Sequence, residues 1–178
     1  MTITINGNWL EQVKESIPDH AKDIKLNLDS SITFSGLATV DAHACAYVAA
    51  LASSNGGLAF EIEMNSPLFL AEAEREAAKT AAALMGMNNV WYTFVDMVDD
   101  PDMKGLATGL HVTDYSTLTG VSKKKFAMYA LCASIVGKCQ YSVQSNYDIL
   151  KAEGMTIQEL MAVGRIAAVI HSIGKIAI

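Results

Sequence analysis

Apolar residues recur at helical spacing along most of this chain, between segments rich in glycine, proline and asparagine. In residues 38–53 the apolar side chains return every three or four positions, at Val40, Ala44, Tyr47, Val48 and Leu51. This period is typical of an amphipathic helix, and the Asn-Gly-Gly sequence at 55–57 is expected to end it. Nowhere do apolar and polar residues alternate over a stretch long enough to predict a β-strand, so a strand is expected at most in residues 1–5. The pattern predicts an all-α protein.

Local signals set the expected boundaries in the first half. A first helix is predicted over 8–15, ended by Pro18, because the residue before a proline is pushed out of the helical region. A second helix is predicted over 19–27, and residues 29–31 and 33–36 are expected to form turns. Ser66 and Pro67 predict the start of a helix that runs to Met85, and after Gly86 a further helical segment is expected over 88–98.

The second half begins with an expected irregular connection over 102–120, which three glycines interrupt. Ser122 is the predicted cap of a helix over 123–136, the Gly-Lys pair at 137–138 breaks it, and the next helix is predicted over 139–153. Thr156 and Glu159 have the spacing of a capping box, so the last helix is expected from there toward residue 178. These segments together predict a bundle of about seven to nine helices.

Composition adds an expectation about assembly. The chain has 178 residues, the size of one domain spanning 1–178, with 51% hydrophobic and 18% charged residues. Alanine is abundant, as in closely packed helices. Helices with so few charges are expected to cover apolar surface by contact with other copies. We therefore expect a homo-oligomer.

The net charge and the cysteine content limit the classes of binding partner and the cellular compartment that are expected for this protein. A net charge of −6 and a pI near 5.1 disfavour nucleic acid and anionic lipid as partners. The uncharged stretches 42–60 and 80–95 are broken by polar residues, so no membrane span is expected. Residues 1–9 lack the pattern of an export signal, and the three cysteines do not form a disulfide framework, which together predict a cytoplasmic protein with reduced thiols.

The histidines do not suggest a metal site. His20, His43, His111 and His171 never fall within one helical turn of each other or of Cys139. No metal is therefore expected. Cys132 lies seven residues before Cys139, about 10 Å away along a helix, which is beyond disulfide reach. Cys132 is thus expected in the core.

Two segments carry a resemblance to a known family. Residues 17–28, Ile-Pro-Asp-His-Ala-Lys-Asp-Ile-Lys-Leu-Asn-Leu, and residues 85–92, Met-Gly-Met-Asn-Asn-Val-Trp-Tyr, closely resemble the alkylhydroperoxidase D family of the carboxymuconolactone decarboxylase-like superfamily. The similarity continues at a lower level through Phe126, Cys139 and the terminal helix. It covers nearly the whole chain beyond the first dozen residues.

The resemblance implies an all-helical antioxidant protein. Members of this family reduce hydroperoxides and help to regenerate a peroxiredoxin, with lipoyl thiols as the reductant and no bound cofactor. The resemblance thus implies a peroxiredoxin or a lipoyl-bearing protein as partner. With the apolar helices, it also predicts a trimer or a multiple of a trimer.

The family's chemistry uses a Cys-x-x-Cys pair at a helix start, a histidine between the cysteines, a second histidine one turn later and a glutamate on the preceding helix. Aligned on Cys139, this chain has Ser142 at the second cysteine and Tyr141 at the intervening histidine. Asn146 stands at the later histidine and Ala127 at the glutamate. The resemblance therefore implies that only the first cysteine of the set is retained.

These substitutions leave two readings open. A serine cannot share a disulfide or resolve a sulfenic acid, so the two-thiol cycle is lost. Cys139 could retain one-thiol chemistry, because a helix N-terminus and the adjacent Lys138 favour a thiolate. The alternative is a non-catalytic structural or regulatory member of the family, in which Cys139 is a small buried hydrophobic residue.

Overall fold

The computed structural model of the chain describes residues 8–65, 69–113 and 120–176, and all regular elements within them are helices. The all-α prediction is confirmed; the possible strand in residues 1–5 lies outside the described residues. In chain order the elements are α1 (Trp9–Ser16), the 3₁₀ turn η1 (Asp19–Ala21), α2 (Lys22–Ile32), α3 (Thr39–Ala52), α4 (Gly56–Asn65), α5 (Glu72–Val98), α6 (Pro101–Lys104), α7 (Lys123–Gly137), α8 (Gln140–Ala152) and α9 (Ile157–Ile173).

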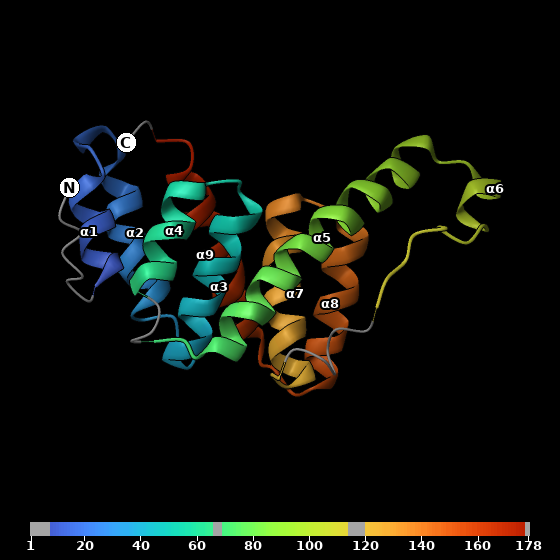
Figure 1. Cartoon of the computed structure of the whole chain (residues 1–178). Coiled ribbons are helices and arrows are strands. Elements are labelled where there is room, and N and C mark those ends of the chain that lie inside the picture. Colours follow the sequence, from blue (N-terminus) through green and yellow to red (C-terminus); the bar gives the residue numbers. More distant parts are fainter. Residues whose placement is uncertain (1–7, 66–68, 114–119, 177–178) are drawn as a thin grey trace.

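Helices α3 and α7 form the centre of the bundle (Figure 1). Helix α3 packs against α5, α7 and α9, and α7 packs against α3, α5, α8 and α9. Residues 42–50 of α3 and 126–134 of α7 are all buried. A helix that is buried all round must be almost entirely apolar, and in these two segments the polar exceptions are His43 and Ser134. The composition thus decides which helices occupy the interior.

Several local signals act as predicted. Asn8 is the N-cap residue of α1, and the helix ends just before Ile17 and Pro18. The Ser122 hydroxyl accepts a hydrogen bond from the Lys125 backbone N–H at 3.2 Å. The Thr156 hydroxyl accepts from the Glu159 N–H at 3.2 Å, while the Glu159 carboxylate accepts from the Thr156 N–H at 2.7 Å. The last helix stops at residue 173 rather than continuing to the end of the described chain.

The predicted turn at residues 29–31 is wrong, because these residues belong to α2. Leu28, Ser31 and Ile32 are buried, and the Asp29 carboxylate forms an ion pair of 2.8 Å with Lys14 on α1. Tertiary contacts therefore extend the helix through residues that favour turns. The helix α4, which begins at the Asn-Gly-Gly stop, was not predicted at all.

The predicted break at Gly86 is also wrong. Helix α5 runs without interruption for 27 residues from Glu72 to Val98. One glycine in a helix interior costs only about 1 kcal/mol, and Met85 and Asn89 on either side are buried in the bundle. The predicted start at Ser66 and Pro67 lies outside the described residues.

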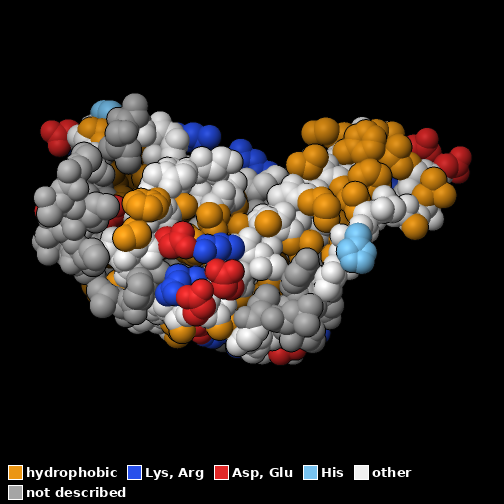
Figure 2. All heavy atoms as spheres, viewed as in Figure 1, with side chains coloured by type: hydrophobic (Ala, Val, Ile, Leu, Met, Phe, Trp, Pro, Cys, Tyr) orange, Lys and Arg blue, Asp and Glu red, His pale blue; other side chains and the backbone are white. Residues whose placement is uncertain are grey.

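The second half of α5 leaves the bundle and, with α6, forms an arm (Figure 1). We use the word arm for residues 90–113. The helix ends at Asp99 in the left-handed conformation with φ 53°, and the four-residue helix α6 follows. The irregular connection predicted over 102–120 is thus interrupted at its start by α6, and residues 114–119 are not described. The arm exposes a concentration of apolar side chains (Figure 2).

Candidate functional site

Cys139 lies at the turn between α7 and α8. Lys138 adopts the left-handed conformation with φ 55°, which ends α7 and places Cys139 as the N-cap residue of α8. The Cys139 carbonyl accepts the first hydrogen bond of α8 from the Val143 N–H at 3.0 Å. Only 1% of Cys139 is exposed. The thiol is therefore at a helix N-terminus, as predicted, but it is covered by protein.

Ser142 lies directly against this thiol. Its hydroxyl donates a hydrogen bond to the Cys139 sulfur at 3.3 Å, and both residues are buried. The structure thus brings together the two residues of the predicted Cys-x-x-Ser pair. Because a hydroxyl cannot form a disulfide bond, this pair has no route to an internal disulfide.

Two of the three other predicted positions, Asn146 and Ala127, contribute no acid or base. The Asn146 side-chain N–H donates to the Ser142 carbonyl at 2.9 Å and contacts the Met85 sulfur at 3.9 Å. Ala127 is buried in α7. An amide and a methyl group do not exchange protons near neutral pH. Neither Asn146 nor Ala127 can therefore relay a proton to or from the thiol.

Tyr141 lies at the surface of the same site. It is 53% exposed, and its ring stacks on that of Tyr92 from α5 with centroids 4.1 Å apart. Burial raises the pKa of Tyr92, and the neighbouring Tyr141 and Cys139 raise it further. The sequence reasoning missed Tyr92 as a site residue, although it belongs to the Met-Gly-Met-Asn-Asn-Val-Trp-Tyr segment that indicated the family.

The remaining cysteines lie in the core. The Cys132 thiol donates to the Cys45 carbonyl at 3.2 Å, and both side chains are fully buried. The hydrogen bond from Cys132 and burial raise the pKa of the Cys45 thiol. The expectation that Cys132 is a core residue is confirmed. No group of three potential metal ligands occurs in the part of the chain that the structure describes.

Comparison with known proteins agrees with this architecture. No protein-family model matches the chain. Three proteins named alkyl hydroperoxide reductase AhpD are similar over most of their length. The protein of Bradyrhizobium sp. BTAi1 is 32% identical over 92% of this chain and 90% of its own. That of Rhodospirillum centenum is 34% identical over 94% and 89%, and that of Streptomyces avermitilis is 33% identical over 93% of both chains. The chain belongs to the AhpD family.

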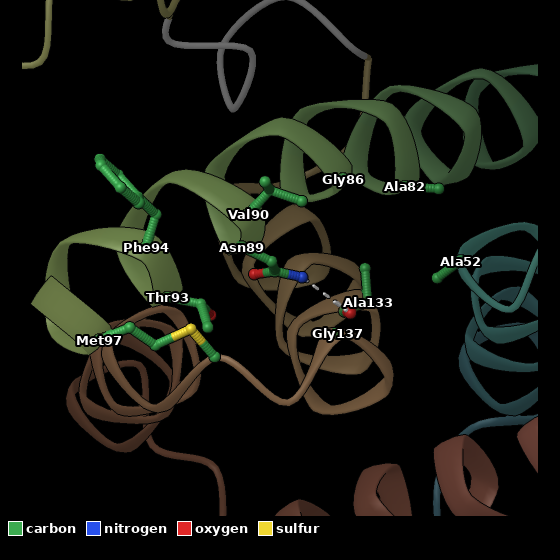
Figure 3. A pocket seen from close by; sticks show the side chains of 10 residues that line it. All are labelled: Ala52, Ala82, Gly86, Asn89, Val90, Thr93, Phe94, Met97, Ala133 and Gly137. Atoms are coloured by element: carbon green, nitrogen blue, oxygen red, sulfur yellow. Dashed lines mark hydrogen bonds between the residues drawn. The ribbon is translucent and has the colours of Figure 1, made fainter.

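A groove on this AhpD-family chain runs along the base of the arm (Figure 3). It has a volume of about 480 Å³ and lies between α5 and residues of α3 and α7. Val90, Phe94 and Met97 line it from α5, and Val90 and Met97 are 71% and 80% exposed. No signal in the sequence distinguished these side chains from core residues, because they continue the helical period of the buried half of α5.

The floor of the groove contains a tight polar contact. The Asn89 side-chain N–H donates to the Ala133 backbone carbonyl at 3.2 Å. The side-chain oxygen Oδ1 of Asn89 is buried without a hydrogen-bond partner among the described residues. Gly137 leaves the space for this side chain, since a Cβ there would lie 2.1 Å from the Asn89 nitrogen. The contact fixes α5 against α7 next to the turn that positions Cys139.

Proposed function

We propose that this chain is an AhpD-family antioxidant and thiol-redox protein that has lost the two-thiol cycle and retains at most one-thiol chemistry at Cys139. The observation behind this proposal is the Ser142 hydroxyl 3.3 Å from the Cys139 sulfur, where the resemblance places a second thiol. Two thiols reduce a hydroperoxide to an alcohol and water and end as a disulfide. One thiol ends as a sulfenic acid, so an external thiol of the lipoyl type must form and then release a mixed disulfide.

Besides the second thiol, the site lacks groups that transfer protons. Ala127, Tyr141 and Asn146 stand where the resemblance implies a carboxylate and two imidazoles. Each missing acid or base typically lowers a rate by about 10²- to 10⁴-fold. The residual chemistry is therefore expected to be slow even when an external thiol is supplied.

A second candidate function is a non-catalytic structural or regulatory role. The burial of Cys139, which is 1% exposed, favours it, because the attacking thiol must reach a peroxide. In this reading Cys139 is an inert residue in the turn between α7 and α8. Thiol accessibility separates the two functions.

Peroxidase turnover with a lipoyl-type reductant tests the first proposal. We expect turnover to be absent or very low, and Ser142→Cys to restore it only in part because the proton-transfer groups are still missing. Robust turnover of the unmodified chain that Cys139→Ser abolishes would refute the degraded site and show that a one-thiol cycle with an external resolving thiol suffices. Turnover that Cys139→Ser leaves unchanged would remove Cys139 from the chemistry altogether.

Thiol labelling then distinguishes the two candidates. One-thiol chemistry predicts fast labelling of the native protein at Cys139, whereas the non-catalytic role predicts labelling only after denaturation. Cys45 and Cys132 are fully buried, so the variant in which both are alanine isolates the signal of Cys139. Ser142→Ala serves as the control for the hydrogen bond to the sulfur.

We also propose that the chain forms a trimer or a multiple of a trimer through the arm and its groove. Support comes from Val90 and Met97, which would otherwise expose large apolar surface to water. By the family resemblance, a peroxiredoxin or a lipoyl-bearing protein is a further candidate partner. The three free cysteines favour action in the cytoplasm, where thiols stay reduced. No helix among the described residues is long and apolar enough to cross a membrane.

A further inference from the structure

A second cavity lies at the opposite end of the bundle from the arm, where α1, α2 and α3 meet. It has a volume of about 240 Å³. Leu10, Ile32, Leu37 and Phe69 give it apolar walls, and it is separate from the Cys139 site and from the groove. An apolar cavity of about 150 Å³ is known to hold a benzene-sized molecule, so this one has room for a somewhat larger guest.

Among the described residues that line this cavity, the one buried polar side chain is that of His43 on α3. His43 is 6% exposed, and its ring stacks on Phe69 with centroids 4.0 Å apart. The Trp9 indole N–H donates to His43 Nδ1 at 2.9 Å. An indole nitrogen only donates, so Nδ1 must be the acceptor and the proton of the neutral ring must be on Nε2. Burial lowers the pKa of His43 to about 4, which keeps the ring neutral.

The Nε2–H group of His43 has no hydrogen-bond partner among the described residues. None of the hydrogen bonds among the described residues involves Nε2, whereas Nδ1 is fully used by Trp9. Nε2 is not among the fully enclosed side-chain atoms that lack a hydrogen-bond partner, so it is accessible, and His43 lines the cavity. A buried donor of this kind requires an acceptor.

The walls determine the chemistry of that acceptor. The described residues that line the cavity include no Lys, Arg, Asp or Glu, so an anion would lose its hydration without a compensating charge. The hydroxyls of Thr33 and Thr39 and the amide of Asn8 lie on more exposed parts of the wall. A guest therefore needs an apolar body and an uncharged oxygen.

We propose that this cavity is a binding site for a small uncharged molecule with an apolar body and a carbonyl or hydroxyl oxygen, and that His43 Nε2–H donates a hydrogen bond to that oxygen. The site does not depend on the chemistry of Cys139. It assigns to the α1–α3 end of the fold a ligand-binding role that is distinct from thiol redox.

Titration of the ¹⁵N-labelled full chain with cyclohexanone, followed through the imidazole ¹H–¹⁵N correlations, tests the proposal. The His43 signal is assigned by its loss in His43→Gln. We expect a saturable downfield shift of the Nε2 proton with a Kd on the order of 1 mM, as for other small ligands of this size. Toluene matches the probe in size but has no oxygen, and we expect it to bind about tenfold more weakly because the hydrogen bond is missing.

Two variants complete the test. Leu37→Trp places a large ring at the cavity wall and is expected to weaken cyclohexanone binding at least tenfold. The matched control Leu26→Trp adds the same ring at an exposed position of α2 and should bind as the unmodified chain does. An ordered water alone in the cavity would give no saturable shift and would overturn the proposal. Equal binding of toluene, or a shift that persists in Leu37→Trp, would overturn it as well.

Discussion

The contact between Gly137 and Asn89 predicts that one added methyl group disturbs the packing of α5 on α7. In Gly137→Ala, the new Cβ would lie 2.1 Å from the Asn89 nitrogen, 2.8 Å from its Cγ and 3.0 Å from its Cβ. All three atoms belong to a buried side chain that is held by a hydrogen bond to the Ala133 carbonyl. The amide must therefore move, and that hydrogen bond is expected to break.

The expected loss of stability follows from these contacts. Forcing extra volume into a packed interior costs about 1–3 kcal/mol, and the lost hydrogen bond adds about 0.5–1.5 kcal/mol. Gly137 is the last residue of α7, so the better helix propensity of alanine offsets only part of this. We expect a net decrease of about 2–3 kcal/mol in the free energy of unfolding. For a chain of this length, that decrease lowers the Tm by roughly 4–12 °C.

Urea and thermal unfolding followed by circular dichroism measure the change. The matched control is Gly164→Ala in the interior of α9, where a Cβ would meet nothing within 4 Å. There the same substitution should stabilise the protein by about 1 kcal/mol, through helix propensity alone. The two glycine-to-alanine substitutions are thus predicted to change the free energy of unfolding in opposite directions.

A double-mutant cycle isolates the clash. Asn89→Ala removes the side chain that Gly137 accommodates, so Gly137→Ala should cost much less in that background than in the unmodified chain. Equal costs in both backgrounds, or a Gly137→Ala variant that is as stable as Gly164→Ala, would refute the argument that this close approach requires glycine.

Three further predictions concern pH, capping and assembly. The folded-state pKa of His43, lowered from 6.5 to about 4, means that the unfolded chain takes up a proton first as the pH falls. Up to about 3 kcal/mol of stability should therefore be lost between pH 6.5 and 4, and urea titrations of His43→Gln should show a smaller loss. Thr156→Ala removes the cap of α9 and should cost about 1 kcal/mol in the same assay. Light scattering should give a trimer or a multiple of it, which Val90→Glu shifts toward monomer; a monodisperse monomer of the unmodified chain would contradict the proposed assembly.

The fold class and several helix boundaries could be predicted from the amino-acid sequence alone. Helical periodicity, proline at 18, the Ser122 cap and the capping box of Thr156 depend on interactions between residues a few positions apart, so they can be read without tertiary information. The family also followed from sequence, because the segment from Met85 to Tyr92 is specific. The resemblance likewise implied that Cys139 and Ser142 lie together at the start of a helix.

The way in which these elements pack and which side chains they expose depend on tertiary contacts. Packing against the bundle holds Gly86 inside one long helix, although glycine locally favours a break. The exposure of Val90 and the burial of Cys139 both depend on what lies opposite them. The stacking of Tyr92 on Tyr141 joins two helices that are distant in the chain. The pairing of Trp9 with His43 joins residues 34 positions apart, beside a cavity that His43 lines. Such contacts are set by the arrangement of helices, which local periodicity does not specify.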